Sequence, residues 1–220
     1  MIRSTRYIDE LIHDLSHVSF NTPDVYNQYA PHNHDNALRC HNLKLYLNEI
    51  LKRQPKYMLV MEAPGYRGCR LTGIPVTSRK ILLEGAMKLD LFGKEQGYQL
   101  TQDAGFENVY GEQSATIVWT ALQDLGITPL IWNTFPFHPR KGDDQCSNRT
   151  PRAEEKNIGA RFLNQIADYF KPEVIIAVGN IAHDTLLRSE INCLKVRHPA
   201  QGGKNDFVEG INQIMNPTSL

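Results

Sequence analysis

The sequence predicts a three-layer α/β/α sandwich with a central, mostly parallel four-stranded sheet. Residues 57–61 and 173–178 are continuous apolar runs, typical of strands that are buried on both faces. Two shorter strand-like runs, 128–132 and 193–196, complete the set, and segments with helical spacing of apolar residues separate all four. Because strands that alternate with helices form parallel sheets with helices on both faces, this order predicts the sandwich.

Helical periodicity and capping residues define the other elements. Gly126 ends one helix, and Thr150 followed by Pro151 predicts the start of another, with threonine as the N-cap and proline in the first turn. Runs rich in Asn, Pro, His or Gly predict loops. The predicted helices are 5–17, 35–53, 78–91, 114–125, 151–170, 181–188 and 206–215, and the predicted loops are 20–34, 92–112 and 134–150.

Length and composition favour one domain over residues 1–220, with an N-terminal helical part (1–56) and a core (57–215). Hydrophobic content of 41% and charged content of 22% are ordinary for a globular protein. No apolar run approaches the roughly 18 to 20 residues of a membrane span, and the first ten residues lack the apolar region of a secretory signal. We therefore expect a cytoplasmic protein, and a monomer.

Lysine and arginine are balanced by aspartate and glutamate, 24 against 24, so the formal net charge is zero. This excludes a protein that binds nucleic acid over its whole surface. Basic residues nevertheless gather beside three loops, which predicts a locally basic rim. They are Arg67, Arg70, Arg79 and Lys80, then Arg140, Lys141, Arg149 and Arg152, and finally Lys195, Arg197 and Lys204.

The four cysteines (40, 69, 146 and 193) form no C-x-x-C pair, which predicts free thiols and no structural zinc or iron–sulfur site. His32, His34 and His41 lie near Cys40, but their spacing fits no familiar zinc site and favours a solvated loop. We expect no metal and no cofactor.

Three loops leave the carboxyl ends of predicted strands: 61–77, 133–150 and 197–203. Each contains proline or glycine together with polar side chains. Ligands of open parallel α/β sheets bind beyond the carboxyl ends of the strands. The three loops are therefore expected to form one site.

The first loop begins M-E-A-P-G-Y, which is neither a Walker A motif nor the G-x-G-x-x-G of dinucleotide-binding folds. With Gly73-Ile74-Pro75 downstream, it resembles the first motif of the uracil-DNA glycosylase superfamily, in the branch that has G-E-A-P-G. The likeness covers roughly residues 57–215. It continues in order through W-N-T-F-P-F-H-P (132–139), N-R-T-P-R-A-E-E (148–155), the stretch 162–179 and R-H-P-A (197–200).

The resemblance implies a metal-independent, monofunctional DNA repair glycosylase that flips uracil out of DNA and hydrolyses its N-glycosidic bond. It places His198 near the uracil O2, where a neutral imidazole N–H would stabilise the departing base. It places Asn133 against the uracil edge, where one amide offers both a donor and an acceptor. Glu62 either activates the water or holds the loop through backbone N–H groups, and both roles stay open.

The same resemblance assigns Ala63, Gly65, Tyr66 and Val76 to the base pocket. Ala63 stands where the fastest members have an aspartate, and Val76 stands where an aromatic ring commonly stacks on the base. Tyr66 or Phe135 are the candidates to replace that ring. Met61, where the motif usually has glycine, is a second departure. The residues expected to contact DNA phosphates are Arg67, Arg70, Arg149, Arg197 and Lys204.

Other functions stay open, and Val76 and Met61 motivate the first of them. One alternative is a glycosylase for another deaminated base, hypoxanthine or xanthine. A second is a catalytically inactive DNA-binding module of the same fold, and a third is a hydrolase of free nucleotides. In the first two cases the partner is still DNA, containing uracil or another deaminated base.

Overall fold

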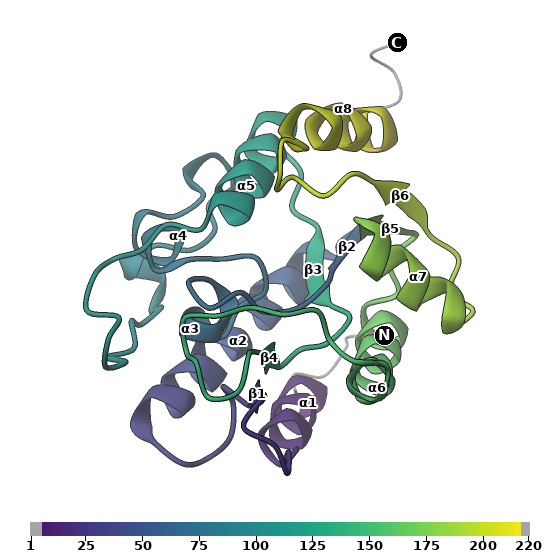
Figure 1. Cartoon of the computed structure of the whole chain (residues 1–220). Helices are drawn as coiled ribbons and strands as arrows, with labels where there is room; N and C mark the ends of the chain where they lie inside the picture. Colours follow the sequence, from purple (N-terminus) through teal and green to yellow (C-terminus); the bar gives the residue numbers. More distant parts are fainter. Residues whose placement is uncertain (1–5, 217–220) are drawn as a thin grey trace.

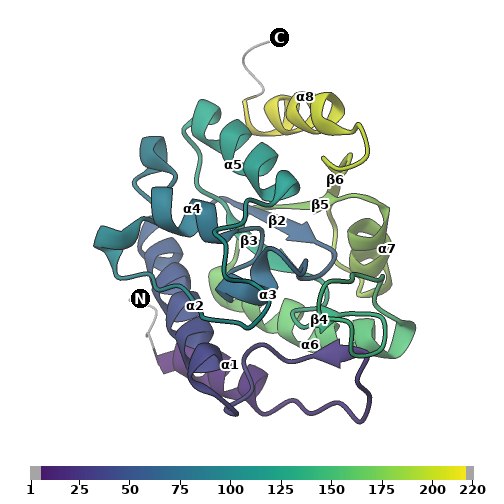
Figure 2. The ribbon, with the colours of Figure 1, turned by 60° about the vertical axis from the view of Figure 1, so that its left-hand side comes forward.

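A computed structural model, which describes residues 6–216, has a four-stranded, fully parallel sheet at its centre (Figures 1 and 2). The spatial order is β3-β2-β5-β6, so β2, which comes first of these four strands in the sequence, lies inside the sheet. Every residue of the strand at 57–61 is buried, which is why this segment is uniformly apolar. The strands are β2 (Tyr57–Met61), β3 (Leu130–Asn133), β5 (Val174–Val178) and β6 (Leu194–Val196).

Helices cover both faces of this sheet, as the sequence predicts. The chain moves from β2 outward to β3, and then in the opposite direction to β5 and β6. Because parallel crossovers are right-handed, the connecting helices must lie on opposite faces. The helices α5 (Gln113–Leu125) and α8 (Lys204–Met215) cover one face, while α6 (Ala153–Phe170) and α7 (Asn180–Arg188) cover the other (Figures 1 and 2).

The N-terminal helices α1 (Arg6–Ser16) and α2 (His34–Arg53) pack against each other beside the β3 edge of the sheet. The buried hydroxyl of Tyr46, in α2, accepts the backbone N–H of Ile131 at 2.8 Å. An edge strand otherwise leaves such donors unpaired. The hydroxyl therefore satisfies one backbone donor of the β3 edge.

Short elements occur where only loops were expected. Two-residue strands β1 (Val25–Tyr26) and β4 (His138–Pro139) pair antiparallel across segments too short to show any periodicity. The predicted helix 78–91 is wrong in its second half, because Gly85 (φ 81°) ends α4 at Glu84. The remaining short elements are α3 (Cys69–Thr72), α4 (Arg79–Glu84), and the 3₁₀ helices η1 (Met87–Leu89) and η2 (Lys94–Gln96).

The predicted start of helix α6, at Thr150 and Pro151, is also wrong. Its N-cap is Arg152 rather than Thr150, and Pro151 lies before the first turn. The carboxylate of Glu155 accepts the backbone N–H of Arg152 at 2.7 Å, which satisfies a donor that a threonine cap was expected to serve. A glutamate three residues inside the helix thus determines the boundary.

Gly159, inside α6, touches the chain that leaves β3. A Cβ atom at this position would lie 2.0 Å from the carbonyl oxygen of Thr134. Helix propensity alone favours alanine over glycine by about 1 kcal/mol, but this contact has no room for a methyl group.

We expect Gly159→Ala to lower the free energy of unfolding by about 1 to 3 kcal/mol, measured by chemical denaturation. Asn157→Ala, on the exposed side of the same helix, should change it by less than about 0.5 kcal/mol.

Candidate active site

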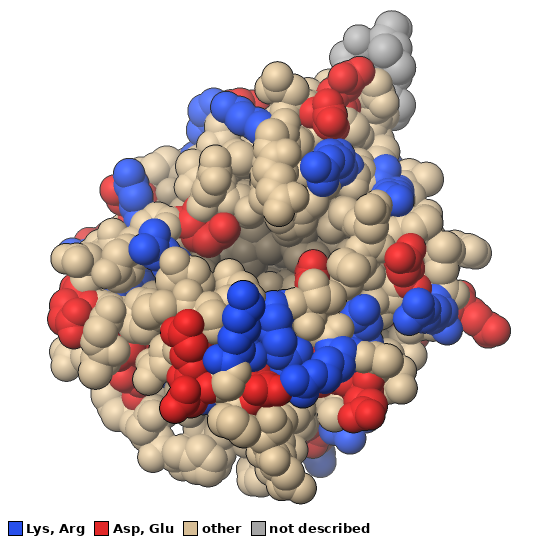
Figure 3. All heavy atoms as spheres, viewed as in Figure 1, with Lys and Arg blue, Asp and Glu red and all other residues tan. Residues whose placement is uncertain are grey.

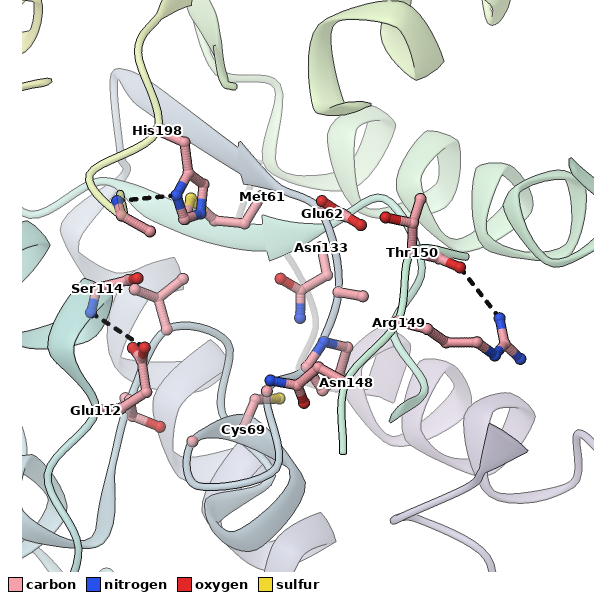
Figure 4. A pocket seen from close by; sticks show the side chains of 17 residues that line it. Met61, Glu62, Cys69, Glu112, Ser114, Asn133, Asn148, Arg149, Thr150 and His198 are labelled. Atoms are coloured by element: carbon pink, nitrogen blue, oxygen red, sulfur yellow. Dashed lines mark hydrogen bonds between the residues drawn. The ribbon is translucent and has the colours of Figure 1, made fainter. Parts of the chain in front are cut away.

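A cavity of about 450 Å³ opens at the carboxyl ends of the strands (Figures 3 and 4). The three loops predicted to form one site all contribute to it, together with the start of α5. Side chains from β2, β3 and the loop after β6 point into it (Figure 4). Its walls are formed by Met61, Glu62, Ala63, Pro64, Gly65, Gly68, Cys69, Val76, Thr77, Glu112, Ser114, Asn133, Asn148, Arg149, Thr150, His198 and Ala200.

Backbone pairing between β2 and β3 extends past the strand ends and positions the cavity floor. Met61 is in register with Asn133, and the N–H of Thr134 donates to the carbonyl of Met61 at 2.8 Å. The N–H of Phe135 then donates to the carbonyl of Glu62 at 3.1 Å, and the Thr134 hydroxyl donates to the same oxygen at 2.7 Å. Glu62 and Asn133 are therefore held side by side.

Asn133 presents its amide to the cavity. The residue is 2% exposed, and its side chain has no hydrogen-bond partner among residues 6–216. The amide atoms reach the surface of the cavity, since they are not among the buried side-chain atoms that lack a partner. That amide can offer both a donor and an acceptor to a ligand.

Glu62 lies beside Asn133 and is partly buried. Burial raises its pKa above the ordinary value of 4.5, although a hydrogen bond from Thr150 and the charge of Lys156 oppose that effect. A carboxylate with a raised pKa is a better proton acceptor than a fully solvated one. The environment of Glu62 therefore favours uptake of a proton by its carboxylate.

His198 extends into the cavity from the loop that follows β6 (Figure 4). Its Nδ1 accepts the backbone N–H of Ala200 at 3.1 Å, so Nε2 carries the proton in the neutral ring. Burial, and then the charge of Arg197, lower its pKa below 6.5 and favour that neutral form. Gly179 permits the close packing, since a Cβ there would lie 3.1 Å from that of His198.

Two side chains hold the loop that follows Glu62. The buried His138 donates from Nδ1 to the carbonyl of Pro64 at 2.9 Å. The Oδ1 of Asn148 accepts the backbone N–H of Tyr66 at 2.9 Å. Both come from the chain after β3, so one loop fixes the shape of the other.

Gly65 and Val76 line the cavity as expected, whereas the aromatic rings of Tyr66 and Phe135 do not. A Cβ at Gly65 would meet only Asn148, at 4.0 Å, so this glycine keeps the cavity open. Val76 lines the wall at φ 51°, a strained value for a β-branched residue, and its carbonyl accepts the indole N–H of Trp119 at 2.7 Å. Tyr66 and Phe135 do not line the cavity. The expectation that Tyr66 contributes its ring to the pocket is wrong, since that ring faces Phe106 and Arg67 instead.

The wall opposite Asn148 comes from the end of the irregular segment 92–112. Glu112 is the N-cap of α5, and its carboxylate accepts the N–H of Ser114 at 3.1 Å. Figure 4 shows both residues on the same side of the cavity. Glu112 and Ser114 therefore lie across the cavity from Asn148.

A buried ionic cluster anchors that segment. Asp103 contacts Arg39, lies 3.2 Å from Arg79, and lies 3.9 Å from Arg70. Burial alone would raise the pKa of Asp103, but the Arg39 charge and a hydrogen bond from Thr101 bring it below its ordinary value. The carboxylate remains ionised and holds the segment against α2, α3 and α4.

In Figure 3 basic side chains gather below the hollow and at its upper right, while acidic side chains lie at its left and right edges. Arg67, Arg197 and Lys204 are exposed, in agreement with an accessible rim. The Arg67 guanidinium also packs 5.3 Å from the ring centre of Tyr66.

Arg70 and Arg149 do not belong to this rim, which corrects the sequence interpretation. The Arg70 side chain is 3% exposed and donates to Gln145 at 2.7 Å. The Arg149 side chain is 15% exposed and forms a two-pronged ion pair with Glu155, at 2.6 and 2.7 Å. Both guanidinium groups have internal partners that hold loops, although Arg149 also lines the cavity.

Several cavity residues were not identified from the sequence. Asn148 and Thr150 lie within the N-R-T-P stretch, and their place on a loop beyond a strand end was the available signal. Glu112 and Ser114 had no such signal, because they approach the site through tertiary packing.

Among the described residues, neither a metal site nor a membrane-spanning helix is found. Within residues 6–216, no group of three or more His, Cys, Asp or Glu side chains is arranged to hold a metal ion. In the same range every helix is too short or too polar to span a bilayer. The four cysteines are free thiols.

A family model described as the uracil DNA glycosylase superfamily matches residues 49–214. This match covers most of the chain and all of the sheet and cavity loops. The protein belongs to the uracil DNA glycosylase superfamily. A search of curated proteins found none that matches.

Membership in this superfamily supports a DNA glycosylase-like function on a DNA substrate. Such enzymes take the target base out of the stack and read its edge inside a pocket. In this superfamily member the unpaired amide, the carboxylate and the imidazole N–H all converge on one cavity.

His138 makes the stability of this glycosylase-like fold depend on pH. Burial lowers its pKa from 6.5 to about 4. The unfolded chain therefore binds a proton between those values that the folded chain excludes, and stability falls as pH decreases from 6.5 towards 4. Once the pH is well below 4, this lowers the free energy of unfolding by about 3 kcal/mol relative to pH 7.

We expect His138→Gln to flatten this part of the stability profile, because an amide can still donate to Pro64 but does not titrate. Denaturant unfolding at several pH values would measure the difference between the two proteins. Parallel profiles for wild type and variant between pH 7 and pH 4 would contradict the assignment.

Proposed function

We propose that this protein is a monofunctional, metal-independent DNA glycosylase that hydrolyses the N-glycosidic bond of uracil in DNA. The observation that carries the proposal is the Asn133 amide, which is 2% exposed and unpaired among the described residues. It supports reading of the uracil edge, with its donor to O4 and its acceptor to N3–H. The branch with a G-E-A-P-G motif, a monomeric state and a cytoplasmic location belong to the same proposal.

In the proposed reaction, water attacks the anomeric carbon of the flipped deoxyuridine as the bond to the uracil nitrogen breaks. Glu62 accepts the proton that the water loses, and the bonding electrons leave with uracil as its anion. The raised pKa of Glu62 suits this role. Thr150, which hydrogen-bonds the carboxylate, orients it.

His198 stabilises the leaving anion in this proposal. Its Nε2–H is free to donate because Nδ1 is occupied by the N–H of Ala200. A fixed donor that faces developing negative charge lowers the barrier without any reorganisation during the reaction. The depressed pKa of His198 keeps the ring neutral at physiological pH, so it acts as a donor and not as an acid.

The exposed basic residues support DNA as the partner. Arg67, Arg197 and Lys204 are accessible near the cavity and can contact phosphates on either side of a flipped nucleotide. A net charge of zero limits binding to this face. Affinity for DNA should therefore fall with salt, with a shallow dependence set by few phosphate contacts.

We expect purified protein to release uracil from an oligonucleotide, measured as strand breaks after alkali. Asn133→Ala should reduce kcat/KM by about 10²-fold or more, because a pocket built to hydrogen-bond a substrate loses heavily when that bond is missing. Asn212→Ala, on an exposed position of α8, is the matched control and should behave as wild type.

Three results would redirect the proposal. Salt-sensitive DNA binding without release of any base would indicate a non-catalytic module. Turnover of free nucleosides would indicate a small-molecule hydrolase. Equal activity of Asn133→Ala and wild type would remove the central observation.

A second candidate is a glycosylase for hypoxanthine or xanthine. The cavity of about 450 Å³ falls within the range of roughly 300 to 1,000 Å³ typical of pockets for drug-sized ligands. Val76 supplies no ring there, and neither Tyr66 nor Phe135 lines the wall. These features leave room for a purine, and faster release of hypoxanthine or xanthine than of uracil would favour this candidate.

Glu62→Gln separates the two roles of this residue. If Glu62 is the base, activity falls as pH is lowered through its raised pKa, and the glutamine variant loses about 10²- to 10⁴-fold in rate together with this acid limb. If Glu62 only holds the loop, glutamine still accepts from Thr150 and the rate is kept. Single-turnover rates from pH 4 to pH 8 measure the difference, and an acid limb that persists in the variant belongs to another group, with His198 as the candidate.

A further inference from the structure

Asn133 alone does not explain how the pocket distinguishes a deaminated base from its amino parent. Its amide has no partner among residues 6–216, so nothing in that range fixes which end is oxygen and which is nitrogen. Rotation by 180° would match a keto edge or an amino edge equally well. A second group of fixed polarity is needed.

Asn148 has that fixed polarity. Its Oδ1 accepts the backbone N–H of Tyr66 at 2.9 Å, and a backbone N–H can only donate. The other end of the amide must therefore be Nδ2, and this nitrogen lies 4.0 Å from the position of the Cβ that Gly65 lacks. Nδ2 has no acceptor among the described residues.

The two amides lie along one wall of the cavity, with Asn133 deep and Asn148 at the exposed mouth (Figure 4). Gly65, which has no side chain, lies beside Nδ2 of Asn148 and lines the same cavity. A base held at Asn133 is therefore expected to lie within reach of Nδ2. Its keto oxygen can accept from Nδ2, whereas an amino group would bring two donors together.

We propose that Asn148 is a specificity-determining residue, whose fixed Nδ2 donor selects bases with a keto oxygen over bases with an amino group. The inference rests on the proposed function, since it concerns the base that enters this same pocket. Deamination converts an amino group into a keto group, so this one donor discriminates a deaminated base from its amino parent. Tyr66 contributes through its backbone N–H, although its ring points away from the cavity.

Asn148→Asp tests the donor separately from the loop contact. An aspartate oxygen still accepts the N–H of Tyr66, but the group that faces the pocket becomes an acceptor. Asn212→Asp introduces the same charge on an exposed position of α8 and is the matched control. Asn148→Ser, too short to reach a base, should lose selectivity without reversing it.

The measurement uses binding, so it does not depend on catalysis. Duplexes carry 2′-fluorinated deoxyuridine or deoxycytidine, whose glycosidic bonds resist hydrolysis, opposite an abasic site so that neither base has a pairing partner. Wild type should bind the uridine duplex at least about tenfold more tightly, and Asn148→Asp should lower this ratio at least about tenfold. The Asn212→Asp ratio should match wild type.

Each outcome decides the proposal. Equal affinity of wild type for the two duplexes overturns it, as does an unchanged ratio in Asn148→Asp with both affinities reduced alike, which would make Asn148 only a loop contact. If Asn148→Asp melts well below wild type, the Asn148→Ser ratio decides. Selective binding without base release would sink the proposed hydrolysis but keep the role of Asn148, while base release without selective binding would do the reverse.

Discussion

The site depends on the parallel pairing of β2 with β3, which continues beyond the strand ends. Met61 faces Asn133 in register, and the carbonyl of Glu62 then accepts from both the backbone and the hydroxyl of the residues that follow β3. Two parallel strands that end at the same level send their loops in the same direction. One ladder therefore brings a carboxylate and an amide, 71 positions apart in sequence, to the floor of one cavity.

The loop after β3 acts as a template for the loop after β2. His138 holds the carbonyl of Pro64, Asn148 holds the N–H of Tyr66, and Thr134 holds the carbonyl of Glu62. Each contact satisfies a backbone group that an irregular loop would otherwise expose to water. Groups fixed before substrate arrives need no ordering when it binds, and this is how a loop rich in glycine and proline becomes a rigid wall.

Local signals were sufficient for most of the fold. The four strands and most of the helices follow from apolar runs, periodicity and glycine stops, and the polar loops beyond the strand ends located the cavity. Several of the failures have one cause, which is a side-chain partner that periodicity and capping signals do not reveal. Glu155 moved the start of α6 from Thr150 to Arg152 and also pairs with the guanidinium of Arg149.

Arg70 shows how such a partner changes the function of a residue. Its charge, next to a loop predicted to bind DNA, suggested a phosphate contact, yet the guanidinium is buried near Asp103 and packs 4.7 Å from the ring centre of Phe106. From there it still affects the site. Burial is the main reason that the pKa of His138 is low, and the charge of Arg70 lowers it further.

A neutral His138 has one ring N–H to give, and it gives it to Pro64, beside the carboxylate of Glu62. A protonated ring would place a second donor at Nε2, which has no partner among the described residues. A buried positive charge without a partner is strongly unfavourable, and Arg70 makes it more so. Burial, reinforced by the charge of Arg70, thus keeps the histidine that shapes the first loop in the one protonation state that the loop can accommodate.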